Sequence, residues 1–143
     1  MNTPSNPDFK FHHVALAVND IDDTTRILGF CGYALSPDYP QLVVDAALGV
    51  KLRFLTPASG GPLLELVCGL GESSPVAQIL QKSGVSLYHI CFEVRDVEEA
   101  VSLLKQQGYV AVSKRMPAKA FGERLIQFLY HKDGGLVELL AAS

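Results

Sequence analysis

Two histidines and two glutamates recur at matched places in two copies of one pattern. The segment HVALAVNDID, residues 13–22, reappears as HICFEVRDVE at residues 89–98, and RFLTPASGGPLLELV (53–67) reappears as QFLYHKDGGLVELL (127–140). The histidines are 89 − 13 = 76 residues apart, and the glutamates are 138 − 65 = 73 apart. The repeat predicts two modules that each contribute one His and one Glu.

These four residues have the chemistry of a metal site. Glu65 and Glu138 are each flanked by Leu and Val, and a carboxylate in an apolar strand needs a cation or hydrogen-bond donors. Alternation along a strand places His13 and His89 on the less bulky face, so both can point into one cleft. Two imidazoles with two carboxylates suit a divalent first-row ion and leave positions for water or substrate. We therefore predict a metal site at His13, Glu65, His89 and Glu138, with Zn, Ni, Co, Mn and Mg all open as its ion.

Each ligand also has a plainer interpretation. A single strand histidine is more often a hydrogen-bonded structural residue, and a single strand glutamate more often lies at an edge. The matched recurrence of all four favours the metal site. His12 and His131 have no counterpart in the other copy, and we expect them at the surface or behind the ligands.

The elements that must position the ligands follow the same repeat. A strand is expected at 11–18, with Val14, Leu16, Ile90 and Phe92 packing beneath helices. Asp20 and Asp96 fit helix N-caps, the second followed by Glu99 in a capping box. Short apolar runs predict the remaining strands at 41–44, 50–55 and 63–67, then at 109–113, 124–129 and 136–140.

The chain has the size of one compact domain. We predict an N-terminal tail at 1–8, a first module at 9–70, a linker helix at 71–84 beginning at Ser74 and Pro75, and a second module at 85–143. Each module reads as strand, helix and then three strands, which makes the fold class α+β. The two sheets are expected to share a cleft.

Composition narrows the partners. The net charge is −3, and the 12 Lys and Arg residues form no runs, which argues against a nucleic-acid or anionic-membrane partner and favours a small molecule. The polar N-terminus and the absence of an 18-residue apolar stretch predict neither a signal peptide nor a spanning helix, and hence a cytoplasmic location. Cys31, Cys68 and Cys91 lack zinc-type spacing and are expected to be free thiols.

At these residues, from Phe11 to Leu140, the chain resembles the vicinal oxygen chelate superfamily. Its members include glyoxalases, extradiol dioxygenases, methylmalonyl-CoA epimerases and antibiotic-resistance proteins. The resemblance implies paired βαβββ modules that form a cup-shaped mixed β-sheet with flanking helices. It also implies a divalent metal bound by His13, Glu65, His89 and Glu138, and commonly a homodimer.

Within the superfamily the chain resembles methylmalonyl-CoA epimerases in particular. The resemblance lies in GVKLRFL (49–55), GESSPVAQILQKSGVSLYHICFEV (71–94) and GGLVELL (134–140). It implies an isomerase that removes the proton next to the carbonyl of a carboxylated acyl-CoA and returns it on the other face, with the metal stabilising the enolate. Glu138 is then assigned an acid/base role beside its role as a ligand.

One position departs from that pattern. The epimerases carry a glutamate two residues before the glycine of the segment matching GVKLRFL, where this chain has Ala47. Asp45 lies two residues earlier, roughly 7 Å along a strand, and is one candidate substitute. Continuing the same face predicts Lys51 and Arg53 in the cleft.

The second module offers further candidates at the offset of 74 residues, namely Lys119, Glu123 and Gln127. Glu123 is the possible replacement base among them. For both Asp45 and Glu123 the plainer interpretation is a solvated turn or rim residue.

Two other functions remain open. A glyoxalase-type lyase acting on a thiol adduct would use the same four ligands, and a non-catalytic protein that binds small molecules such as drugs would keep the cleft without turnover. An extradiol dioxygenase fits less well, because redox iron sites favour two His with one carboxylate.

Overall fold

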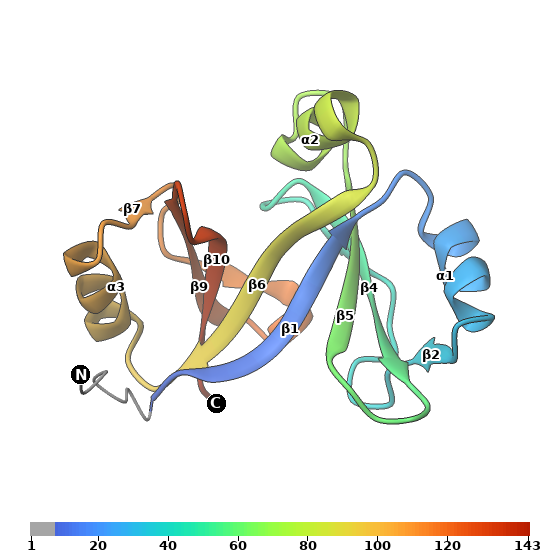
Figure 1. The fold of residues 1–143 in the computed structure, drawn as a ribbon, viewed down its shortest axis with the longest axis horizontal. Helices are drawn as coiled ribbons and strands as arrows, with labels where there is room; N and C mark the ends of the chain where they lie inside the picture. Colours follow the sequence, from blue (N-terminus) through green and yellow to red (C-terminus); the bar gives the residue numbers. More distant parts are fainter. Residues whose placement is uncertain (1–7) are drawn as a thin grey trace.

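The fold is a single mixed β-sheet with helices at its ends and one helix between its halves (Figure 1). The computed structural model describes residues 8–143, so residues 1–7 of the predicted tail lie outside the described residues. The first half comprises β1 (Lys10–Ala17), α1 (Ile21–Gly29), β2 (Tyr33–Leu35), β3 (Val43–Asp45), β4 (Val50–Pro57) and β5 (Leu63–Gly69). After α2 (Pro75–Ser83), the second half comprises β6 (Ser86–Val94), α3 (Val97–Gln106), β7 (Val110–Ala111), β8 (Met116–Ala118), the 3-10 turn η1 (Lys119–Phe121), β9 (Arg124–His131) and β10 (Gly135–Ala141).

The two halves join through their first strands. The sheet order is β2-β4-β5-β1-β6-β10-β9-β7, with β3 paired to β4 and β8 paired to β9. Strand β1 runs antiparallel to β6, whereas β1 with β5 and β6 with β10 are parallel pairs. The predicted α+β class and mixed sheet are therefore confirmed.

The helices begin where the sequence predicts. Asp20 accepts a hydrogen bond from the Asp23 backbone N–H at 2.9 Å, and Asp96 accepts one from the Glu99 N–H at 3.1 Å. Helix α1 packs Ile21 against Leu55 and Leu66, and α3 packs its own apolar face against β9 and β10. These contacts cover the two outer ends of the sheet.

Ile90, on the outer face of the sheet, is not covered by a helix as predicted. Phe92 packs with the α3 cluster as expected, but Ile90 is 41% exposed. Figure 1 shows the reason: α1 and α3 lie at opposite ends of the sheet, so neither helix covers the middle of β6.

The shortest strands also differ from the prediction. Strands β2 and β8 were not expected, β7 spans two residues of the predicted 109–113, and β3 begins two residues later than predicted. Each pairs along an edge of β4 or β9. Their extent is set by that pairing, which a short stretch of sequence does not encode.

Helix α2 is fixed over the inner face by a close packing contact. Ser74 caps it by accepting a hydrogen bond from the Ala77 N–H at 3.0 Å, and Ser74 packs directly against Gly69 at the end of β5. A Cβ at Gly69 would overlap the Ser74 hydroxyl oxygen and approach the Ala77 nitrogen to 3.2 Å. Glycine at 69 therefore permits the cap that positions α2.

We expect Gly69→Ala to lower the free energy of unfolding by about 1–3 kcal/mol, because the added methyl group overpacks this contact. Chemical denaturation measures the change. Ser74→Ala removes the overlapping oxygen, so Gly69→Ala should cost clearly less in that background. Equal costs in both backgrounds would show that Ser74 does not impose the constraint.

Candidate metal centre

Strand register brings the four repeated residues together. Ala15 is paired with Glu65 on one side and with His89 on the other, so these three form one row across β5, β1 and β6. Cys91 is paired in the same way with His13 and Glu138 across β1, β6 and β10. Each glutamate thus meets the histidine of the other module across one small residue.

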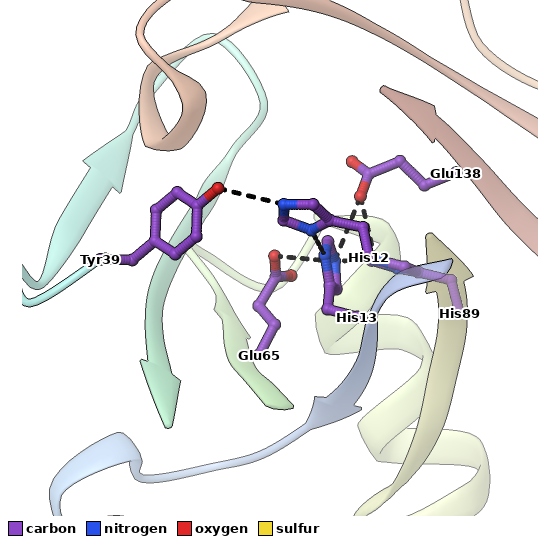
Figure 2. A network of polar contacts seen from close by, with 6 residues as sticks. All are labelled: His12, His13, Tyr39, Glu65, His89 and Glu138. Carbon is purple, nitrogen blue, oxygen red and sulfur yellow. Dashed lines mark hydrogen bonds and ion pairs between the residues drawn. The ribbon is translucent and has the colours of Figure 1, made fainter. Parts of the chain in front are cut away.

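The ligand atoms converge on a single point (Figure 2). The two histidine Nε2 atoms are 3.2 Å apart, and His13 Nε2 lies 3.4 Å from Glu65 Oε2. Glu138 Oε1 lies 3.3 Å from the Nε2 atoms of both histidines. Metal bonds of about 2.0–2.1 Å place neighbouring ligands roughly 2.9–3.4 Å apart, the smaller spacing for an ion that keeps further positions open. The spacing therefore fits four ligands around one small dication.

Burial means that the charges at this point need compensation. All four side chains are buried, and their ligand atoms lie within 4.8 Å of one another. Among residues 8–143, Glu138 Oε1 and His89 Nδ1 are buried without a hydrogen-bond partner. Two carboxylates in this setting need protons or a metal to compensate them, since unpaired buried charge is costly. The cluster is consistent with a divalent metal site.

The pKa shifts within the cluster reflect two opposing effects: burial disfavours the charged forms, and neighbouring opposite charges favour them. Burial raises the pKa of Glu65, against the influence of both histidines. Burial also acts to raise the pKa of Glu138, but the adjoining His89 and His13, each 3.3 Å away, outweigh it and lower that pKa. For His89, burial acts to lower the pKa and the adjoining Glu138 raises it above the ordinary value. The lowered pKa of Glu138 and the raised pKa of His89 both favour the charged forms of these two paired side chains.

One ligand is supported by a layer behind it. His12 Nδ1 lies 2.8 Å from His13 Nδ1, and His12 Nε2 lies 3.0 Å from the Tyr39 hydroxyl (Figure 2). Burial, followed by the charge of His13, lowers the pKa of His12 to about 4, so His12 is neutral near pH 7. Such a partner fixes the tautomer and ring orientation of a ligating histidine. His12 takes the second of its two expected placements, behind the ligands, whereas Tyr39 carried no sequence signal.

A cavity of about 470 Å³ opens onto the cluster. Glu65, His89 and Glu138 form part of its wall, while His13 is fully buried behind them. The rest of the wall is mainly apolar, with contributions from α2, β4, the β7–β8 segment and η1. A ligand in the cavity would therefore meet the metal-binding atoms at one polar spot.

Asp45 lies in the cavity wall but has structural hydrogen bonds. It is 3% exposed, and its Oδ1 accepts from the Leu48 N–H at 3.2 Å. Its Oδ2 accepts from the Lys119 N–H at 3.0 Å, which ties β3 to η1 across the two halves. Its proposed acid/base role stays a prediction.

The prediction that Lys51 and Arg53 face the cleft is wrong. Arg53 donates to Asp22 and Thr25 of α1 on the outer side, and Lys51 lines a separate surface depression near Asp22. Strict alternation fails because the chain turns at residues 46–49, with Gly49 at φ +70. Beyond that turn, Leu52 and Phe54 face the interior instead.

The second-module candidates also lie outside the cavity. Lys119 and Glu123 are exposed, and Gln127 accepts a hydrogen bond from Arg115 and donates one to the Ser113 carbonyl. The turn between Asp45 and Val50 has four residues, 46–49, whereas that between Ala118 and Arg124 has five, 119–123. Glu123 adopts φ +68, close to that of Gly49, so it occupies a left-handed turn position. The structure does not bring it to the metal centre, and its replacement-base role stays a prediction.

The cysteines and the remaining histidine play other parts. All three cysteines are free: Cys31 is exposed, Cys68 is buried, and Cys91 lies fully buried between His13 and Glu138. Burial raises the pKa of the Cys91 thiol well above its ordinary value, as does the neighbouring Glu138. His131 accepts backbone hydrogen bonds within the β9–β10 turn.

Removal of a ligand tests the centre. We expect the wild-type protein to retain one equivalent of divalent metal after reconstitution and His89→Ala to retain none, measured by elemental analysis. A metal present at 100 times its Kd should raise the free energy of unfolding of the wild type by about 2.7 kcal/mol. His131→Ala, which removes an imidazole outside the cluster, should still bind metal. A metal-free wild type after reconstitution would contradict the assignment.

Comparison with known proteins agrees with this geometry. Residues 12–128 match the family model described as the Glyoxalase/Bleomycin resistance protein/Dioxygenase superfamily. The chain is 34% identical to the mitochondrial methylmalonyl-CoA epimerase of Homo sapiens, over 91% of this chain and 72% of that protein. It is 33% identical to the ethylmalonyl-CoA/methylmalonyl-CoA epimerase of Cereibacter sphaeroides, over 91% and 96% of the two chains.

Solved structures show the same likeness. A methylmalonyl-CoA epimerase in complex with methylmalonyl-CoA and NH4+ superposes with a TM-score of 0.76 at 25% identity, covering 95% of this chain and 96% of the other. Within the described residues, no helix has the length and apolar character needed to span a membrane. The ligand cluster, the sheet and these matches show that the chain belongs to the glyoxalase/bleomycin resistance protein/dioxygenase superfamily.

Proposed function

We propose that the protein is a divalent-metal-dependent isomerase that moves the proton next to the carbonyl of a carboxylated acyl-CoA. The observation that carries the proposal is the buried cluster of two histidines and two glutamates at the wall of an apolar cavity. The likeness to epimerases of methylmalonyl-CoA and ethylmalonyl-CoA supports the substrate class. A bound dication would supply Lewis-acid stabilisation of the negative charge that develops on the substrate oxygen.

Glu138 is the best placed group to move the proton. Its Oε1 faces both histidines, and Figure 2 shows its second oxygen turned away from them. A carboxylate can bind a cation through one oxygen and accept a proton through the other. Because Glu138 also lines the cavity, that second oxygen can serve as the general base.

The apolar wall contributes by excluding water. Val67, Val76, Phe121 and Phe128 lie in the wall near the cluster and contribute no charge. In such surroundings the electrostatic interactions with a developing negative charge are stronger than in water. The cavity therefore supports enolate formation next to the ligands.

The opposite face of the substrate has few groups that could return a proton. Apart from the cluster, the titratable side chains in the described wall are Asp45 and Tyr88. Both oxygens of Asp45 accept backbone N–H groups, and burial, together with Glu138 and Glu65, raises the pKa of Tyr88 to about 12. Tyr88 is thus a neutral proton donor near pH 7, and Ala47 offers no acid/base group at all.

Solvent exchange tests the reaction directly. Metal-loaded protein in deuterium oxide should incorporate deuterium next to the carbonyl of methylmalonyl-CoA, as measured by mass spectrometry. Glu138→Gln should lose this exchange by a factor of about 10²–10⁴, since it removes the general base. If the wild type binds methylmalonyl-CoA but exchanges nothing, a binding protein without turnover becomes the better assignment.

Restoring a carboxylate at residue 47 tests the second proton transfer. Ala47 is exposed at the mouth of the cavity, where a longer side chain can be accommodated. Ala47→Glu should raise the rate at which the configuration of methylmalonyl-CoA inverts, by about 10² or more. Circular dichroism of the resolved substrate follows the inversion.

The matched control for that substitution is Ala47→Gln, which adds nearly the same volume without a base. Equal rates in the two variants would mean that residue 47 acts by packing rather than by proton transfer.

A further inference from the structure

The described cavity wall contains no Lys or Arg, although the proposed substrate is highly anionic. The wall residues are apolar, polar or acidic. The acidic side chains of the described wall are Asp45, Glu65 and Glu138. Phosphate groups would be costly to bury among them, because a charge without a partner loses its hydration. The phosphates of an acyl-CoA must therefore lie outside the mouth of the cavity.

The mouth can be located from the wall residues that are exposed. These are Ala47 in the β3–β4 turn, Pro75 at the start of α2 and Val112 after β7. Val112 is 57% exposed, which places the segment that follows it at the edge of the opening.

That segment carries the positive charge. Between residues 112 and 120, wall residues alternate with exposed cations: Ser113, Met116, Ala118 and Ala120 line the cavity, while Lys114, Arg115 and Lys119 point to solvent. The equivalent segment of the first module, residues 36–48, contains Asp38 and Asp45 and no Lys or Arg. The two sides of the opening therefore differ in sign.

These cations are available for a ligand. The ion pairs between described residues that involve arginine use Arg26, Arg53, Arg95 and Arg124. None of the ion pairs found in residues 8–143 uses Lys114, Arg115 or Lys119. Arg115 donates through Nε to Gln127 at 3.1 Å, which orients its guanidinium group from a buried side chain.

We propose that Lys114, Arg115 and Lys119 form a basic rim that binds the phosphates of coenzyme A while the acyl group enters the cavity. This inference rests on the proposed function for the identity of the carrier. Arginine and lysine both bind phosphate well, arginine through paired donors and lysine as a point charge. In a chain of net charge −3, a local positive rim also directs an anionic ligand to this side of the mouth.

Binding of free coenzyme A tests the rim without requiring turnover. The triple variant K114Q/R115Q/K119Q should raise the Kd for coenzyme A about tenfold, as expected for the loss of several exposed charge contacts. Its affinity for pantetheine, which lacks the phosphates, should not change. Isothermal titration calorimetry measures both ligands, and added salt should weaken coenzyme A binding to the wild type much more than to the variant.

A matched control separates a local rim from net charge. K82Q/K105Q/K132Q removes three exposed lysines elsewhere and changes the net charge by the same amount. It should leave the Kd for coenzyme A close to that of the wild type. Because R115Q also removes the hydrogen bond to Gln127, the double variant K114Q/K119Q provides a second test, with a smaller rise in Kd expected.

The outcomes distinguish this inference from the proposed function. Equal loss of affinity in the two triple variants, or no coenzyme A binding by the wild type, would overturn the rim. Rim-dependent binding without deuterium exchange would keep the rim and reject the isomerase. Deuterium exchange on methylmalonyl-CoA, together with an unchanged affinity of the rim variant for coenzyme A, would keep the isomerase and reject the rim.

Discussion

The antiparallel pairing of β1 with β6 is the constraint on which the rest of the structure depends. It places Ala15 beside His89 and His13 beside Cys91, while parallel pairing adds Glu65 to the first row and Glu138 to the second. A slip of one residue would turn the histidines to the outer face of the sheet. Neither module can complete the centre alone, because each glutamate lies in a row with the histidine of the other.

This arrangement would couple the fold to the proposed divalent ion. The four ligands occupy the inner face of the sheet, where His13 packs against Phe54 and Phe121 and unpaired carboxylates oppose folding. A bound dication would convert that cost into stabilisation, since ligands assembled by the fold need no further ordering to bind it. Small residues at the centre of both rows, Ala15 and Cys91, leave room for the ligand atoms to meet. His12 and Tyr39 then fix the orientation of His13 from behind.

The sequence predicted what depends on regular periodicity. Alternation along β1 and β6 identified the inner face, and the repeat identified the four residues that converge there. The same alternation failed beyond Gly49, where a left-handed turn resets which face a residue occupies, and so placed Lys51 and Arg53 wrongly. The offset of 74 residues correctly pairs Gly49 with Glu123, but both occupy a left-handed turn position rather than the cavity wall. Before that point the offset fails, because the second turn is one residue longer and Asp45 corresponds to Ala118 instead of Lys119. Turn geometry depends on individual backbone angles, and a hydrophobic pattern does not contain them.

The departures from internal symmetry are where the two modules acquire different tasks. A ligand set related by a pseudo-twofold repeat offers the same chemistry to either end of a substrate, so it cannot by itself orient one. Orientation must come from side chains that differ between the halves: His12 against Tyr88 beside the ligands, Ala15 against Cys91 between them, and an acidic against a basic segment at the mouth. We therefore assign the four symmetric residues to the metal, with Glu138 also proposed as a base, and the asymmetric ones to recognition and to the return of the proton. In this proposal four matched residues identify the superfamily, whereas the choice of substrate is assigned to residues without a counterpart in the repeat.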